Sequence, residues 1–244
     1  MMNCQCFPLY WYEENKNKQH SLFDSENSDD YIRRDGITDW ILKEVRSRYG
    51  TREITKEMIF YYVYGLLHSE DYRQRFAADL KKSLPRIPIV DRVEDFMDFY
   101  RAGKKLADLH LNYENVPPCA ETVVRITNPK NAGQDDYEYF RVWDKMRFKS
   151  KNDKSTIIYN GNITIENIPK KAYDYVVNGK SAIEWIVERY CVSQDKKSLI
   201  KNDCNDWSKE HGKPRYILDL LLSVINVSVQ TVDIVKALPK LKFD

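Results

Sequence analysis

Glycine is scarce in this sequence, with 8 among 244 residues, whereas soluble proteins average about 7% glycine. No two of these glycines lie within ten residues of each other. A phosphate-binding loop needs closely spaced glycines, because only then can several backbone N–H groups approach the same anion. The sequence therefore excludes both common types of nucleotide-binding loop.

An excess of charge of one sign is also missing. Lysine and arginine number 39 against 37 aspartates and glutamates, which gives a formal net charge of +2. A near-neutral chain has no general attraction for polyanions, so any contact with nucleic acid must come from local basic patches.

Long apolar runs and a secretory signal are absent as well. No apolar stretch approaches the roughly 20 residues that cross a bilayer, and the first residues, MMNCQCFPLYWYEE, lack the basic and apolar regions of a signal peptide. Five cysteines, an odd number, indicate reduced thiols rather than a disulfide framework. We expect a soluble, cytoplasmic protein without a membrane contact.

A metal site is not expected. Cys4 and Cys6 are two residues apart, but no second pair and no nearby histidine completes a zinc site. The four histidines are scattered and never have the i, i+4 spacing of a helical metal site. The sequence also contains no Gly-x-Ser-x-Gly and no His-Glu-x-x-His motif. We therefore expect no catalytic residues, no metal and no cofactor in this chain.

The first half of the sequence has the pattern of helices. Thr38 and Thr55 fit N-caps, Gly50 fits a left-handed C-cap, and Ser69 fits the N-cap of a third helix that ends before Pro85. The apolar spacing supports this interpretation. Residues 13–35 are polar and are expected to form a linker. The expected helices cover residues 38–49, 56–68, 69–84 and 93–111.

The middle of the sequence has the pattern of strands. β-branched and aromatic residues alternate in four stretches, and Asn160-Gly161 between two of them predicts a hairpin with positive φ at both turn residues. The expected strands lie within residues 121–127, 137–148, 155–160 and 162–167.

Helical patterns return after the strands. Gly179 fits a C-cap and Ser181 an N-cap. The predicted class is α+β, mostly helical, with one small antiparallel sheet in the middle. We expect an N-terminal extension and linker over residues 1–36, a helical subdomain over 37–114, and a sheet with C-terminal helices over 115–244. The later helices are expected near residues 169–177, 181–190, 214–225 and 229–238.

Two stretches are locally basic. Residues 73–86 contain five basic side chains and one acid, and residues 141–154 contain six and two, so each carries a net charge of +4. Such stretches can neutralise DNA phosphates. A solvated surface with ion pairs inside the chain would produce the same composition, and the sequence leaves both interpretations open. A metal-dependent nuclease would need acidic residues near a lysine on strands. Asp79-Leu80-Lys81 has the spacing but falls inside an expected helix, and Asp144 and Asp153 have no clear partner.

Several segments, in order along nearly the whole chain, resemble the C-terminal specificity region of type ISP restriction–modification enzymes. They are CFPLYWYEE, IFYYVYGLLHSEDYRQRF, ADLKKSLPRIPI, AGKKLADLHLNYE, KMRF, TIIYN, IPKKAYDYVVNGKSAIEWIVERY and VSVQTVDIVKALP. One loop departs from the family pattern Ser-Gly-Ile-x-Asn-Asp-Pro-Asn, because Leu199 stands in place of the glycine and Cys204 in place of the proline.

The resemblance implies a DNA-binding, target-recognition portion of a longer polypeptide. Such polypeptides join a nuclease, an ATP-driven translocase and an N6-adenine methyltransferase, which use ATP, magnesium and S-adenosylmethionine. The chain would be a C-terminal fragment or a split subunit, with duplex DNA and the upstream domains as partners. From charge clustering, the residues expected to contact phosphates are Arg73, Lys81, Lys82, Arg86, Lys104, Lys105, Arg147 and Lys149. The alternative is a scaffold that touches no DNA and docks the recognition domain on the methyltransferase.

Overall fold

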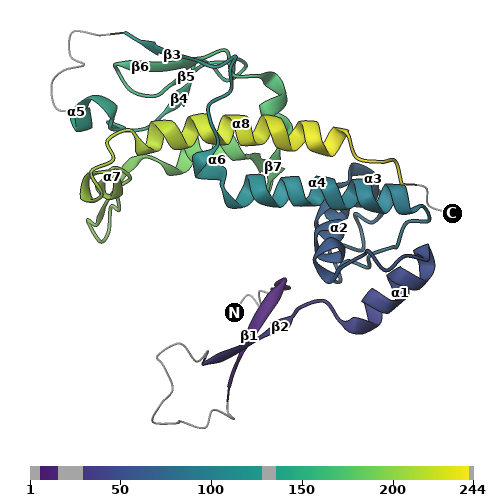
Figure 1. The fold of residues 1–244 in the computed structure, drawn as a ribbon. Helices are drawn as coiled ribbons and strands as arrows, with labels where there is room; N and C mark the ends of the chain where they lie inside the picture. The colour runs from purple at the N-terminus through teal and green to yellow at the C-terminus, as the bar shows by residue number, and fades with distance from the viewer. Residues whose placement is uncertain (1–5, 16–29, 128–135, 242–244) are drawn as a thin grey trace, which may run out of the picture. The chain divides into compact units, whose positions relative to one another are not determined.

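A computed structural model describes residues 6–15, 30–127 and 136–241, and the linker predicted within residues 13–35 lies mostly outside them. The chain divides into two compact units, the first made of residues 1–105 and 238–244 and the second of residues 106–237. Figure 1 follows the chain through both units. Each unit has its own hydrophobic core.

The first unit is mainly helical, as predicted. Thr38 and Thr55 accept hydrogen bonds from the backbone N–H groups of Ile41 and Met58, and Gly50 takes the left-handed conformation with φ 64°. The predicted boundaries of these helices are confirmed. The elements are β1 (Tyr10–Glu14), antiparallel to β2 (Tyr31–Asp35), then α1 (Asp39–Tyr49), α2 (Lys56–His68), α3 (Glu70–Arg75) and α4 (Val93–Leu111).

Aromatic side chains fill the core of the first unit. The rings of Tyr62 and Phe96 are stacked with centroids 4.6 Å apart, and Phe99 meets Tyr62 edge-on at 6.0 Å. The Tyr62 hydroxyl donates to the Pro88 carbonyl at 2.6 Å, so this buried polar group is satisfied. Tyr62 therefore serves packing, as the sequence pattern indicates.

The third predicted helix is shorter than expected. α3 ends at Arg75, and residues 76–82 continue as successive turns in which i, i+3 and i, i+4 hydrogen bonds alternate. Tyr72 provides a reason, because its hydroxyl donates to the Arg86 carbonyl at 2.7 Å and ties the Pro85 end of the segment back to α3. Tertiary contacts thus override the helix propensity of the Ala77–Lys82 stretch.

The second unit combines helices with short antiparallel strands, which confirms the α+β class. The expectation of a single sheet is wrong, because the described residues form a four-stranded sheet in the order β3-β6-β5-β4 and additional two-stranded ones. The elements of the second unit are η1 (Tyr113–Asn115), β3 (Val123–Ile126), α5 (Asp136–Phe140), β4 (Arg147–Phe148), β5 (Ile157–Ile158), β6 (Ile163–Glu166), η3 (Lys170–Asp174), β7 (Val176–Val177), β8 (Lys180–Ser181), α6 (Ala182–Arg189), β9 (Val192–Gln194), β10 (Lys201–Asp203), α7 (Asp206–Glu210) and α8 (Tyr216–Lys236).

Helix α8 lies at the centre of the second unit, with the four-stranded sheet along one side (Figure 1). Two separate helices were predicted here, but neither glycine nor proline interrupts the stretch, and the Ser228 hydroxyl bonds back to the Val224 carbonyl at 2.7 Å. α8 is long and apolar enough to cross a membrane, which the sequence analysis did not anticipate. Most of it is buried inside the unit, as expected of a core helix.

The predicted strand over residues 137–148 is mostly wrong. Its first part forms α5, and only Arg147 and Phe148 pair in the sheet. The buried Asn160 amide explains this, because its nitrogen donates to the carbonyls of Tyr139 and Arg141 at 3.1 and 2.9 Å. The Tyr139 carbonyl lies in α5 and the Arg141 carbonyl just after it, and both accept from a side chain rather than from a neighbouring strand.

The Asn160-Gly161 hairpin is confirmed, but its predicted turn type is wrong, since neither residue has positive φ. The Asn160 side-chain oxygen instead accepts from the N–H groups of the next strand, and a Cβ at Gly161 would lie 2.4 Å from the Trp143 ring. Positive φ at both positions occurs at Asn178-Gly179, which joins β7 to β8. Gly179 is thus a hairpin residue rather than the predicted C-cap.

Ser181 is the N-cap of α6, as predicted, and forms a capping box with Glu184. The Lys154 ammonium at 2.6 Å, with the N–H and hydroxyl of Ser181, lowers the pKa of Glu184 to about 2. A carboxylate whose pKa is lower in the folded than in the unfolded chain stabilises the fold above its unfolded pKa, and this contribution disappears as the pH falls toward the folded value.

We therefore expect the free energy of unfolding to fall between about pH 5 and pH 2, and to fall less steeply in Glu184→Gln. The substitution should also cost up to about 1 kcal/mol at pH 7, because glutamine can keep the capping box but loses the ion pair with Lys154. Denaturant unfolding of both proteins from pH 2 to pH 7 measures this. Parallel pH curves would contradict the role of Glu184.

Candidate nucleic-acid interface

The clearest local excess of positive charge lies on residues 73–86, called the basic segment below. It comprises the last turn of α3 and the turns that follow. The rings of Tyr72 and Phe76 lie 5.0 Å apart, and Phe76, Leu80 and Ile87 pack against the core of the first unit. The backbone of the segment is thereby fixed, and its polar side chains face the solvent.

All five cations of the basic segment are exposed, and none forms an ion pair with a carboxylate in the part of the chain that the structure describes. Burial lowers the pKa of nearby His68, and the positive charge of Arg73 lowers it further. Unpaired cations are available to bind phosphate, since no internal bond must first be broken. They are Arg73, Arg75, Lys81, Lys82 and Arg86; of these, Arg75 was not among the predicted contacts.

Two further predicted residues lie on α4, also in the first unit. Both Lys104 and Lys105 are exposed. The Lys104 ammonium lies 3.9 Å from the Glu57 carboxylate, a long contact between two solvated groups that contributes little.

The second basic stretch, residues 141–154, is largely compensated by acids. The predicted residues Arg147 and Lys149 pair with Asp144 at 3.1 Å and with Asp153 at 3.8 Å. Arg141 and Lys154 also pair with carboxylates, those of Glu138 and Glu184. These contacts are the internal ion pairs that the sequence analysis left open as an alternative, and phosphate binding by Arg147 and Lys149 stays a prediction.

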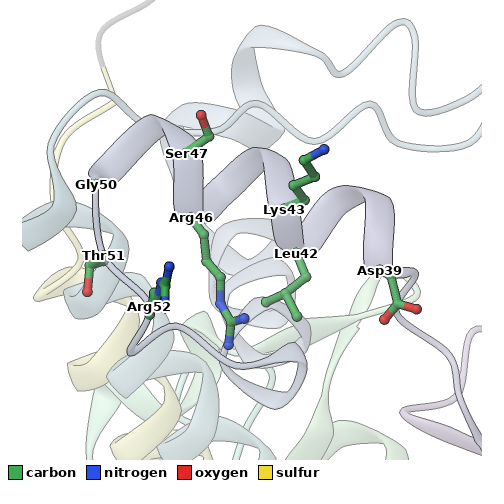
Figure 2. Close-up of a pocket in the computed structure, with 8 residues that line it drawn as sticks. All are labelled: Asp39, Leu42, Lys43, Arg46, Ser47, Gly50, Thr51 and Arg52. Atoms are coloured by element: carbon green, nitrogen blue, oxygen red, sulfur yellow. The ribbon is translucent and has the colours of Figure 1, made fainter.

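An open pocket beside α1 carries cations that the sequence analysis did not single out (Figure 2). Lys43 points to the opposite side of the helix from Arg46, so the charges of these two side chains do not converge on one point. The Arg46 Nε donates to the Ile54 carbonyl at 2.8 Å, which gives this arginine a structural role. Asp39 in the same pocket pairs with Lys56 at 2.6 Å.

Among the described residues, no three histidine, cysteine, aspartate or glutamate side chains are grouped to hold a metal ion. Burial raises the pKa of the Cys204 thiol to about 12, so it stays protonated and inert at neutral pH. His110 contacts the Thr231 hydroxyl at 2.9 Å within the second unit. Cys4 lies outside the described residues.

Several solved structures resemble this chain, among them the following three. The Type ISP restriction–modification enzyme LlaBIII bound to DNA is 41% identical over 97% of this chain, with a TM-score of 0.78. A nuclease-deletion mutant of the Type ISP enzyme LlaGI, in complex with a DNA substrate mimic, is 47% identical over 80% of this chain, with a TM-score of 0.68. A DrdV–DNA complex is 31% identical over 86%, with a TM-score of 0.68.

This chain corresponds to only 14%, 17% and 20% of the lengths of those three chains. A search of curated proteins finds no significant match. The family model described as the Type ISP C-terminal specificity domain matches residues 1–220, which is most of the sequence. The chain therefore belongs to the family of Type ISP C-terminal specificity domains.

Proposed function

We propose that this chain is the target-recognition part of a Type ISP-like restriction–modification enzyme and that it holds duplex DNA through the basic segment. The observation that carries the proposal is the set of five exposed cations without carboxylate partners, in a chain that resembles domains of DNA-bound enzymes. In this mechanism Arg73, Lys81, Lys82 and Arg86 contact phosphates and set the position on the duplex, while other side chains contact base edges.

The chain itself performs no catalysis in this proposal. Adenine methylation, ATP-dependent translocation and DNA cleavage belong to the other domains of the longer polypeptide or to a separate subunit. Those domains would bind S-adenosylmethionine, ATP and magnesium. The wide spacing of the glycines and the lack of a metal-ligand group among the described residues support this division. The whole enzyme would act in the cytoplasm, in defence against foreign DNA.

Fluorescence anisotropy with a mixed-sequence duplex at several salt concentrations tests the proposal. Each phosphate contact contributes about −0.9 to the slope of log affinity against log salt. We expect the basic segment to contribute about −4 to this slope, from contacts with most of its cations. A folded sample that fails to bind at roughly 50 mM salt would refute DNA binding by this chain.

A second candidate function is favoured by an apolar groove in the first unit. The groove has a volume of about 380 Å³ and lies beside α2, where Phe60, Val63 and Leu67 meet Phe7 and Leu84. An apolar surface of this kind can dock another protein surface. In this alternative the chain is a scaffold for the upstream methyltransferase domain. Under this alternative, the folded chain should bind the separately expressed methyltransferase domain and should show no affinity for DNA.

A further inference from the structure

The β9–β10 hairpin projects from the second unit next to α7 (Figure 1). Every residue from 193 to 202 is exposed, whereas every residue of β6 in the four-stranded sheet is buried or half-buried. At its tip, residues 195–200, the side chains of Leu199 and Ile200 are 68% and 61% exposed. Two adjacent large apolar side chains at the end of a projecting hairpin contribute nothing to the core of the protein.

The tip is well ordered by its own hydrogen bonds. The Asp195 carboxylate accepts from the N–H groups of Lys197 and Ser198 at 3.0 and 2.8 Å and from the Ser198 hydroxyl at 3.0 Å. The Asp195 N–H donates to the Ile200 carbonyl at 2.9 Å, and the Gln194 amide donates to the Leu199 carbonyl at 2.9 Å. These bonds hold the tip in one conformation before any partner binds.

The base of the hairpin is anchored in the second unit by a buried asparagine. The Asn205 side chain accepts from the Val142 N–H at 2.8 Å and donates to the Val142 carbonyl at 2.8 Å. It also donates to the Asp203 carboxylate at 2.7 Å. The base of the hairpin is therefore fixed to the second unit by three side-chain hydrogen bonds.

Leu199 has a backbone conformation that leucine rarely adopts, with φ +60°. In leucine this conformation brings the Cβ atom too close to the following carbonyl oxygen. Glycine has no Cβ and would take the conformation without that close contact. The leucine side chain is neither buried nor in contact with the core, so packing does not offset this strain. Backbone strain without compensating packing occurs most often at sites that bind a ligand.

The charges around the tip favour a polyanion as the partner. Lys196 and Lys197 are exposed and have no carboxylate partner among the described residues. The one acid of the tip, Asp195, is turned toward the backbone by its hydrogen bonds. Lys201 pairs with Asp203 at 3.2 Å, at the base of the hairpin.

From these observations we propose that the tip of the β9–β10 hairpin enters a groove of duplex DNA, where Leu199 and Ile200 wedge against a base step and Lys196 and Lys197 contact the flanking phosphates. The inference rests on the proposed function. Two-stranded ribbons fit a DNA groove, and leucine and isoleucine are among the side chains that proteins insert between bases. The proposal assigns the second unit a direct contact with DNA that does not depend on residues 141–154.

The test uses duplexes that carry 2-aminopurine at each position in turn, because its fluorescence rises when a base unstacks. The wild-type chain should raise the fluorescence at one step. Leu199→Gly should abolish that rise and weaken binding about tenfold without changing the salt slope, while its melting temperature rises by about 2–4 °C as the strain is relieved. Lys196→Ala with Lys197→Ala should reduce the salt slope by about 1.8.

The matched control is Leu111→Ser, which removes another exposed leucine of the second unit, 78% exposed, from the end of α4. It should leave affinity and fluorescence unchanged. If the wild type binds duplex DNA but Leu199→Gly binds and unstacks bases equally well, the hairpin proposal is wrong and the proposed function stands. If the wild type binds no DNA, both are refuted.

Discussion

Gly103→Ala is expected to destabilise the first unit strongly. A Cβ at this position would lie 1.8 Å from the Tyr61 carbonyl oxygen and 2.7 Å from the Gly65 backbone nitrogen, so α2 and α4 would have to separate. Backbone atoms cannot move aside as the end of a flexible side chain can. Alanine's better helix propensity recovers only about 1 kcal/mol. We expect a net loss of at least about 2 kcal/mol in the free energy of unfolding, or roughly 4–8 °C in melting temperature.

Gly212→Ala is the matched control for this substitution. Gly212 has φ +60° and nothing within 4 Å of the position of a Cβ, so alanine there meets strain but no clash. The expected cost is about 1 kcal/mol. Thermal unfolding of both variants, followed by circular dichroism, measures the difference. A Gly103→Ala protein as stable as the wild type would contradict the close approach of α2 and α4.

Removal of the charges of the basic segment is expected to have the largest effect on DNA binding. A variant with alanine at all five positions should lose about 4 units from the slope of log affinity against log salt, because each lost phosphate contact removes about 0.9. The five side chains are exposed and make no ion pairs among the described residues, so their loss should leave the fold intact. The substitutions are Arg73→Ala, Arg75→Ala, Lys81→Ala, Lys82→Ala and Arg86→Ala.

The control removes charges that are already paired. Arg147→Ala with Lys149→Ala leaves Asp144 and Asp153 without their partners, and we expect the salt slope to change by less than 1. Circular dichroism confirms that both variants are folded. If the control lowers the slope as much per charge as the five-fold variant does, phosphate binding is not concentrated on the basic segment.

The helix ends could be predicted from the sequence because their causes are local. Thr38, Thr55 and Ser181 each bond an N–H group within three residues, and Gly50 stops α1 through its own φ. The end of α3 could not be predicted from the sequence, because it depends on the hydrogen bond from the Tyr72 hydroxyl to the Arg86 carbonyl across the turns. The Asn160-Gly161 turn type failed for a similar reason, since that glycine makes room for Trp143.

The candidate site was predictable only in part. Composition located the basic segment and left internal ion pairs open for both stretches. The i, i+3 and i, i+4 spacings of Arg147–Asp144 and Lys149–Asp153 are local enough to have been found in the sequence. The pairing of Lys154 with Glu184, thirty residues away, needed the fold. The β9–β10 hairpin carried almost no strand signal, because its strands have three residues each and few β-branched side chains.

The central claim is that this chain recognises a DNA target, and selection from a pool of random duplexes tests it most directly. We expect rounds of binding at near-physiological salt to enrich one site, bound at least about 10³-fold more tightly than unselected DNA. The basic-segment variant should weaken binding to selected and unselected duplexes alike. A folded wild-type chain that binds the pool but enriches no sequence, or that binds no DNA, would contradict the account.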